Sequence, residues 1–183
     1  MHRGEVGTEI APALAVGADA AATATAARID EMLRRTCDLA RALTHAEQAA
    51  LKLDVDDDPG LTRKYFSLSP AYQRWREYRV DPHGLGLHGI DIPPGEAVRL
   101  TQAEVEAHPA WQAFGEQAPS HPPLRGWLAA SVCGEGGHTY GLLQLSDKTG
   151  GADFDERDEQ LVLELVAVVG AALDALRAAH ASN

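Results

Sequence analysis

Residues 120–162 constrain the fold of this chain more than any other segment. Two apolar runs, residues 127–133 and 139–146, flank the turn sequence Gly-Glu-Gly-Gly. Because glycine adopts positive φ without steric cost, this pattern predicts an antiparallel β-hairpin at the centre of a sheet. A Lys-Thr-Gly-Gly loop follows, and Asp153 or Asp155 can then cap a helix with an acidic first turn, where the helix dipole favours anions.

Apolar periodicity places the other elements around this hairpin. A period of about 3.6 residues indicates one long helix from about residue 20 to 43 and another from about residue 156 to 179. Strands are expected over residues 46–53, 61–68 and 97–100. We therefore expect five or six strands, with a long amphipathic helix at each end of the domain.

Two short sequences predict helix starts between the strands. Ser69 followed by Pro70 is typical of an N-cap and the first helical position, and predicts a helix up to about residue 78. Thr101 with Glu104 three residues later has the spacing of a capping box. These two helices belong to segments that connect the strands.

Composition indicates one globular domain. Of the 183 residues, the first 20 or so are rich in Ala and Gly and are expected to form a flexible tail, with a single domain over residues 21–180. The formal net charge of −11 argues against nucleic acids and anionic membranes as partners. There is no run of 18 apolar residues and no secretory signal, so we expect a cytoplasmic protein with Cys37 and Cys133 as reduced thiols.

Several segments of the chain resemble one known family. The sequences RKYFSLSPAYQRWREYR (residues 63–79), VRLTQAEVEAHPAWQAF (98–114), HPPLRGWLAA (121–130) and LLQLSDK (142–148) are similar to the GAF modules of bacterial multi-sensor histidine kinases and diguanylate cyclases. The resemblance implies an α/β (α+β) fold: an antiparallel sheet of five to six strands, the N- and C-terminal helices on one face, and a ligand pocket on the other. One departure is Ser131, where the family pattern usually has Pro.

The resemblance also implies a function. GAF domains bind small molecules in signal transduction, so the chain is expected to be a sensor rather than an enzyme. Its partners would be a small-molecule ligand, a second copy of the chain, and a histidine kinase or another signalling protein. Dimerisation is expected through the amphipathic helices around residues 29–43 and 161–176, where apolar and small residues form a seam.

The residues expected to bind the ligand lie in the segments that cross over the sheet and on the hairpin. Aromatic side chains would form the apolar lining of the pocket, and polar side chains would hydrogen-bond the ligand. This combination is typical of small-ligand sites. The predicted set is Trp75, Arg76, His88, Trp111, His121, Arg125, Trp127 and Gln144. The alternative for the three tryptophans is that they fill the core.

The alternative to an unidentified ligand is haem, in a gas or redox sensor or in a haem-dependent enzyme. The HPPLR segment is similar to the HPPMR segment of haem-binding GAF domains, and this resemblance would make His121 the proximal iron ligand. Gln144 stands where that family has a distal Tyr. The chain lacks a recognisable cyclic-nucleotide signature, and its two cysteines are not placed for bilin attachment or methionine-sulfoxide reduction. Hydrolase and phosphate-binding motifs are also absent from the sequence.

Overall fold

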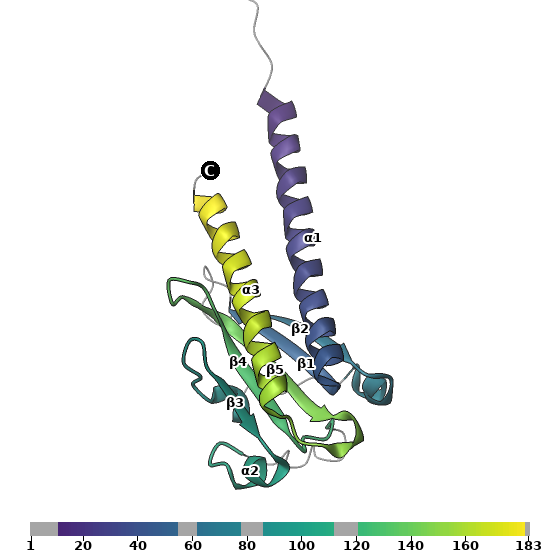
Figure 1. Cartoon of the computed structure of the whole chain (residues 1–183). Coiled ribbons are helices and arrows are strands. Elements are labelled where there is room, and N and C mark those ends of the chain that lie inside the picture. The colour runs from purple at the N-terminus through teal and green to yellow at the C-terminus, as the bar shows by residue number, and fades with distance from the viewer. Residues whose placement is uncertain (1–10, 55–61, 78–85, 112–120, 182–183) are drawn as a thin grey trace, which may run out of the picture. The chain divides into compact units, whose positions relative to one another are not determined.

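The computed structural model describes residues 11–54, 62–77, 86–111 and 121–181. Its strands are β1 (Ala46–Asp54), β2 (Thr62–Leu68), β3 (Ala97–Leu100), β4 (Trp127–Cys133) and β5 (Thr139–Lys148). Its helices are α1 (Ala11–Thr44), α2 (Gln102–Ala107) and α3 (Glu156–Ala181), with short 3-10 turns η1 (Pro70–Trp75), η2 (Gly86–Gly89) and η4 (Thr149–Gly151). The strands form one five-stranded antiparallel sheet in the order β2-β1-β5-β4-β3 (Figure 1).

The predicted hairpin is confirmed. Strands β4 and β5 pair antiparallel, with Trp127 opposite Ser146 and Cys133 opposite Thr139. The turn includes Gly137 at φ 78°, a conformation that glycine adopts without strain. Strand β5 is the middle strand of the sheet, so the hairpin lies at its centre as expected.

Helix α1 begins earlier than the sequence pattern predicted. It starts at Ala11 rather than near residue 20, so residues 11–20 are helical instead of part of a tail. This stretch is rich in alanine, the residue with the highest helix propensity, and Pro12 is tolerated in a first turn. The chain divides within this helix into two units, Met1–Met32 and Leu33–Asn183. The sheet, α2, α3 and the last part of α1 belong to the second unit.

The turn after β2 is also different from the prediction. Pro70 does open a helical segment, but this is the 3-10 turn η1, which ends at Trp75. Ser69 makes no side-chain cap, since its hydroxyl donates to Glu47 on β1. The capping box of α2 is confirmed, because Thr101 Oγ1 accepts from the Glu104 backbone N–H and the Glu104 carboxylate accepts from the Thr101 N–H.

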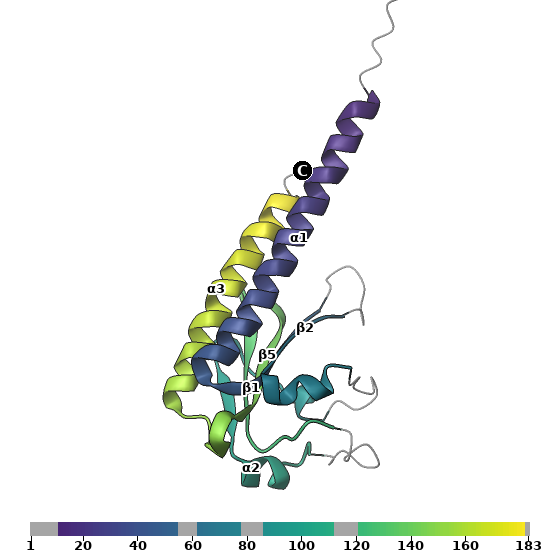
Figure 2. The ribbon, with the colours of Figure 1, turned by 90° about the vertical axis from the view of Figure 1, so that its right-hand side faces the viewer.

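One face of the sheet is covered by helices. In α1, Leu33, Cys37 and Ala40 are buried, and Arg41 Nε donates to Ser67 Oγ on β2 at 2.8 Å. Helix α3 runs along the same sheet (Figure 1) and buries Val162, Val166 and Val169. The turn η1 lies on the other side of the strands from α3 (Figure 2).

Close contact with the hairpin fixes the middle of α3. A Cβ added to Gly170 would lie 1.9 Å from the carbonyl oxygen of Cys133, so only glycine fits there. One turn later, the Asp174 carboxylate accepts from Tyr140 Oη at 2.6 Å and from the Glu135 N–H at 2.8 Å. These contacts bind α3 to both strands and the turn of the hairpin. No described helix is long and apolar enough to cross a membrane.

Candidate functional site

The sheet face opposite α3 carries an apolar cluster that contains two of the predicted site residues. Trp127, on β4, is 1 % exposed and packs with Leu87, Ile92 and Val105. Trp111 packs against this cluster and is only partly buried. Trp127 therefore fills the core of this face, as the alternative prediction for the tryptophans states. Ser131 joins β4 to the cluster, since its hydroxyl lies 2.8 Å from the Ile92 carbonyl oxygen.

Gln144 meets this cluster from the neighbouring strand. The indole Nε1–H of Trp127 donates to Gln144 Oε1 at 3.3 Å. Because an indole nitrogen can only donate, this bond fixes the amide with its oxygen toward Trp127. The amide nitrogen, with its two hydrogens, is then directed elsewhere, and Gln144 is only partly buried. The structure thus brings together Trp127 and Gln144, two residues that the sequence analysis selected.

A second group of polar residues gathers around Asp147 at the end of β5. Asp147 is 2 % exposed and has φ 54°, a left-handed conformation in which Asp is among the better tolerated residues. Its carboxylate accepts from Tyr72 Oη at 2.5 Å and from the backbone N–H groups of Arg125 and Gly126 at 2.5 and 3.3 Å. This network joins η1, the start of β4 and the end of β5.

Trp75 and Arg125 belong to that second group. Trp75 lies against Tyr72, with 4.8 Å between the ring centroids. Arg125 Nη2 lies 3.5 Å from Tyr72 Oη. Burial is the main cause that raises the pKa of Tyr72 to about 12, and the bond to Asp147 adds to it. Tyr72 is therefore a neutral donor at pH 7.

A cavity of about 260 Å³ opens beside the Asp147 network. It contains Arg125 and does not contain Trp127 or Gln144, so the predicted site residues fall into two groups in the described structure. Its lining residues are Gln102, Arg125, Gly126, Asp147, Lys148, Gly151, Ala152 and Asp153.

The remaining predicted residues are placed separately. His121 is half-buried, and its Nδ1 lies 2.5 Å from the Pro122 carbonyl oxygen. Burial lowers the pKa of His121 below its ordinary value, which favours a neutral imidazole at pH 7. Arg76 is exposed at the end of η1. The side chain of His88 lies outside the described residues.

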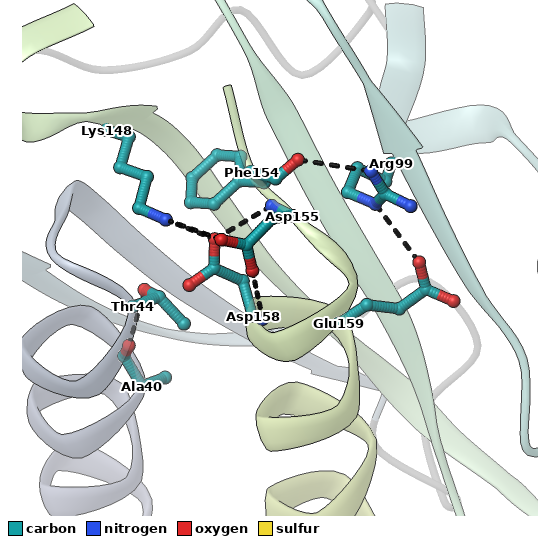
Figure 3. Close-up of polar contacts among 8 residues, drawn as sticks. All are labelled: Ala40, Thr44, Arg99, Lys148, Phe154, Asp155, Asp158 and Glu159. Atoms are coloured by element: carbon teal, nitrogen blue, oxygen red, sulfur yellow. Dashed lines mark hydrogen bonds and ion pairs between the residues drawn. The ribbon is translucent and has the colours of Figure 1, made fainter. Parts of the chain in front are cut away.

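A polar junction connects the end of β5 to the start of α3 (Figure 3). Lys148 Nζ contacts Asp158 Oδ2 at 2.5 Å, and the side chains are 14 % and 6 % exposed. Asp155 and Asp158 cap α3 reciprocally, each backbone N–H donating to the other's carboxylate at 2.9 and 3.0 Å. Of the two residues predicted as the N-cap of α3, Asp155 is the one that caps the helix. Lys148 thereby holds the N-terminal turn of α3 against the sheet.

A second contact secures the same turn of α3 from β3. Arg99 Nε donates to Glu159 at 3.1 Å, and Arg99 Nη1 donates to the Phe154 carbonyl oxygen at 3.2 Å (Figure 3). These polar contacts therefore join the start of α3 to β5 and β3. A displacement of either strand would be transmitted to α3 through these contacts.

Potential metal ligands and two thiols are also present in the described part of the chain. Within residues 11–54, 62–77, 86–111 and 121–181, no group of three His, Cys, Asp or Glu side chains is arranged to hold a metal ion. Cys37 and Cys133 are free thiols. Burial raises the pKa of Cys37 to about 12, so this thiol is protonated and unreactive at pH 7.

The sequence analysis missed Asp147 and Lys148 as polar residues that organise the site. Asp147 and Lys148 are two opposite charges directly at the end of an apolar strand. Charged residues are rarely buried without a partner, so their position was a usable signal. Their partners, Tyr72 and Asp158, lie 75 and 10 positions away in the chain.

Comparison with known proteins identifies the fold. The GAF domain of a PixJ photoreceptor from Thermosynechococcus elongatus shares 13 % identity and a TM-score of 0.58, over 85 % of this chain and 90 % of that one. A domain of a protein assigned to the two-component sensor histidine kinases of Sinorhizobium meliloti shares 17 % sequence identity with this chain. Its TM-score is 0.56, and the match covers 84 % of this chain and 95 % of that one. The GAF domain of a phosphoenolpyruvate-protein phosphotransferase from Coxiella burnetii shares 21 % sequence identity with this chain. Its TM-score is 0.51, and the match covers 78 % of this chain and 80 % of that one.

The family assignment rests on sequence as well as on shape. The family model for the GAF domain matches residues 28–173, which include every strand, half of α1 and most of α3. The five-stranded antiparallel sheet with helices on one face agrees with that match. This chain belongs to the GAF domain family.

Proposed function

We propose that this chain is a cytoplasmic sensor domain of bacterial signal transduction, which binds a small molecule and signals through a ligand-dependent change of a homodimer. The observation that carries the proposal is the pair formed by Trp127 and Gln144 on the sheet face opposite α3. The buried Trp127 ring fixes the orientation of the partly exposed Gln144 amide, and an oriented donor on an otherwise apolar face is the kind of polar group that a small-ligand site needs. The predicted set around this pair, from Trp75 to Gln144, remains part of the proposal.

The structure offers a route from this site to α3. Gln144 and Lys148 lie on the same strand, and Lys148 contacts Asp158 in the first turn of α3. A ligand that favours one position of β5 would shift α3 through this contact. It would do so only if it binds the two arrangements with different affinities.

Apolar residues on the helices support the homodimer. Val168 on α3 is 70 % exposed, and Leu39 and Leu43 on α1 are 51 % and 48 % exposed. On α3, Val168 follows Leu165 by three residues, and Leu165 follows Leu161 by four, which places them on one stripe separate from the sheet-facing valines. A second copy of the chain would bury this stripe, and a histidine kinase or another signalling protein would receive the change.

The ligand-binding part is tested by thermal-shift screening of a metabolite library, with hits titrated by calorimetry. We expect Gln144→Leu to lower the affinity of a hit about tenfold, because the substitution removes the oriented amide at nearly constant size. Gln160→Leu, at an exposed position of α3 on the other side of the sheet, is the matched control and should leave the affinity unchanged. A library without any compound that stabilises the wild-type protein would contradict the proposal.

The homodimer is tested by light scattering after size-exclusion chromatography. Val168→Glu should convert the dimer to a monomer, since it places a charge in the apolar stripe. Ala167→Glu adds the same charge at an exposed position off the stripe and should leave the dimer intact. A monomeric wild-type protein at tens of micromolar would contradict this part, and Leu165→Glu would then also change nothing.

The geometry of His121 favours a second candidate function, in which the ligand of the domain is haem. With the proton on Nδ1 directed to the Pro122 carbonyl oxygen, Nε2 keeps its lone pair, the arrangement found in metal-ligating histidines. His121 would be the sole protein ligand to the iron, and the haem would supply gas or redox sensing. Titration with haemin should give a Soret band that His121→Ala abolishes without unfolding the protein. No Soret band in the wild-type protein would exclude this candidate function.

A further inference from the structure

Two lysines lie directly opposite each other on neighbouring strands. Lys52 of β1 and Lys64 of β2 are register partners in the antiparallel pair. Like charges in this position repel and destabilise a sheet. Lys52 has a weak partner in Asp54, at 3.4 Å between two well-exposed side chains. Among the described residues, the side chain of Lys64 has no hydrogen bond or ion pair.

This lysine pair lies on the sheet face opposite α1 and α3. Ser67 on β2 contacts Arg41 of α1, so its side chain points to the helical face. Side chains alternate along a strand, and therefore Lys64 and Phe66 point to the opposite face. Lys52 points the same way, because directly paired residues share a face.

The same face carries a row that connects β2 to Gln144. Phe66 is paired with Ala50, and Ala50 is paired with Gln144 on β5. Phe66 is 54 % exposed, which is unusual for a phenylalanine ring on a sheet face. Ala50 lies between the ring and the amide in this row and is buried, at 6 % exposure. Phe66 and Gln144 are two strands apart, about 10 Å, and the lysine pair lies about 7 Å along the strands from this row.

Protection of an exposed sheet edge explains only part of this arrangement. Strand β2 is an edge strand, and lysines on edge strands discourage pairing with other chains. That account covers Lys64, but Lys52 lies on the interior strand β1. It also leaves the exposed ring of Phe66 unexplained. In a chain with a formal net charge of −11, a pair of facing lysines is a local exception that favours an anion.

We infer that the ligand of this domain is a small organic anion with a flat apolar body. Its anionic group would lie between Lys52 and Lys64, and its apolar body on the ring of Phe66 above Ala50. An acceptor atom would take a hydrogen bond from the Gln144 amide nitrogen. This inference rests on the proposed function and names the chemical class of its ligand.

A matched pair of fluorescent probes tests the inference. The probes are 8-anilinonaphthalene-1-sulfonate and N-phenyl-1-naphthylamine, which share one aromatic skeleton and differ in the sulfonate. We expect Lys64→Gln to weaken binding of the sulfonate about three- to fivefold, the scale of an exposed charge pair, and to reduce its salt dependence. Binding of the neutral probe should not change. Phe66→Ser should weaken the binding of both probes.

Arg63→Gln is the matched control, because it removes the same charge from the neighbouring position of β2 on the other face. It should leave both affinities unchanged. If Lys52→Gln and Lys64→Gln have no effect on the sulfonate, or if Arg63→Gln has an equal effect, the ligand class is refuted while small-molecule binding stands. If neither probe nor any library compound binds the wild-type protein, the proposed function fails and the inference fails with it.

Discussion

Replacement of Asp147 should be among the most destabilising single changes in the sheet. Its carboxylate accepts three hydrogen bonds, from the Tyr72 hydroxyl and from the backbone N–H groups of Arg125 and Gly126. Asp147→Ala removes all three, at about 1–1.5 kcal/mol each. It also places alanine at a left-handed φ, which costs about 1 kcal/mol more. We expect a loss of about 4–5 kcal/mol, a large part of a typical domain's stability of about 5–15 kcal/mol.

Two further variants of Asp147 separate the loss of hydrogen bonds from the cost of the left-handed backbone conformation. Asp147→Gly loses the hydrogen bonds but relieves the backbone, so it should be about 1 kcal/mol more stable than the alanine variant. Asp147→Asn keeps an acceptor for both backbone N–H groups and tolerates the left-handed conformation, so it should cost only about 1–2 kcal/mol. The expected order of stability is Asn, then Gly, then Ala.

Urea denaturation monitored by tryptophan fluorescence, with linear extrapolation to water, gives the free energies of unfolding. Tyr72→Phe is the partner variant, and its double-mutant cycle with Asp147→Asn measures the coupling of the hydroxyl to the carboxylate. A glycine variant less stable than the alanine variant would refute the argument from backbone conformation. An alanine variant within 1 kcal/mol of the wild type would refute the hydrogen-bond argument.

Two further predictions concern the contacts that hold α3. Lys148→Met should cost about 3 kcal/mol in urea denaturation, because it leaves the buried Asp158 carboxylate without its cation, and a change below 1 kcal/mol would contradict this role. The hydrogen bond from Tyr140 is the main cause that lowers the pKa of Asp174, so its contribution is complete above the ordinary carboxyl pKa near 4 and is lost as pH falls through the lowered value. The stability advantage of the wild type over Asp174→Asn should thus disappear between about pH 5 and pH 2, and an advantage independent of pH would contradict this assignment.

Local features of the fold could be predicted from the sequence. The hairpin of β4 and β5, strand β3 and the capping box at Thr101 depend on residues within a few positions of one another, and all three are confirmed. The start of α1 was missed because an Ala-rich stretch was interpreted as low complexity rather than as a good helix former. The 3-10 turn at Pro70 was expected to be an α-helix because the start signal alone does not fix the hydrogen-bond pattern that follows.

The site was harder to predict, because its contacts join distant parts of the chain. Trp127 and Gln144 were both selected, but their hydrogen bond depends on strand register. The partners of Asp147 lie 22 and 75 positions away in the chain, so no local pattern indicates the network. The row of Phe66, Ala50 and Gln144 likewise exists only once three strands are paired. The ligand-binding set as a whole stays a prediction.

The close approach of Gly170 to Cys133 has a mechanical consequence. Because the helix backbone touches the strand there and Asp174 binds the hairpin one turn later, α3 cannot slide along the hairpin like a piston. Lys148 holds the other end of the helix. A shift of the hairpin is therefore expected to carry α3 with it as one unit, so that the helix axis follows the strands.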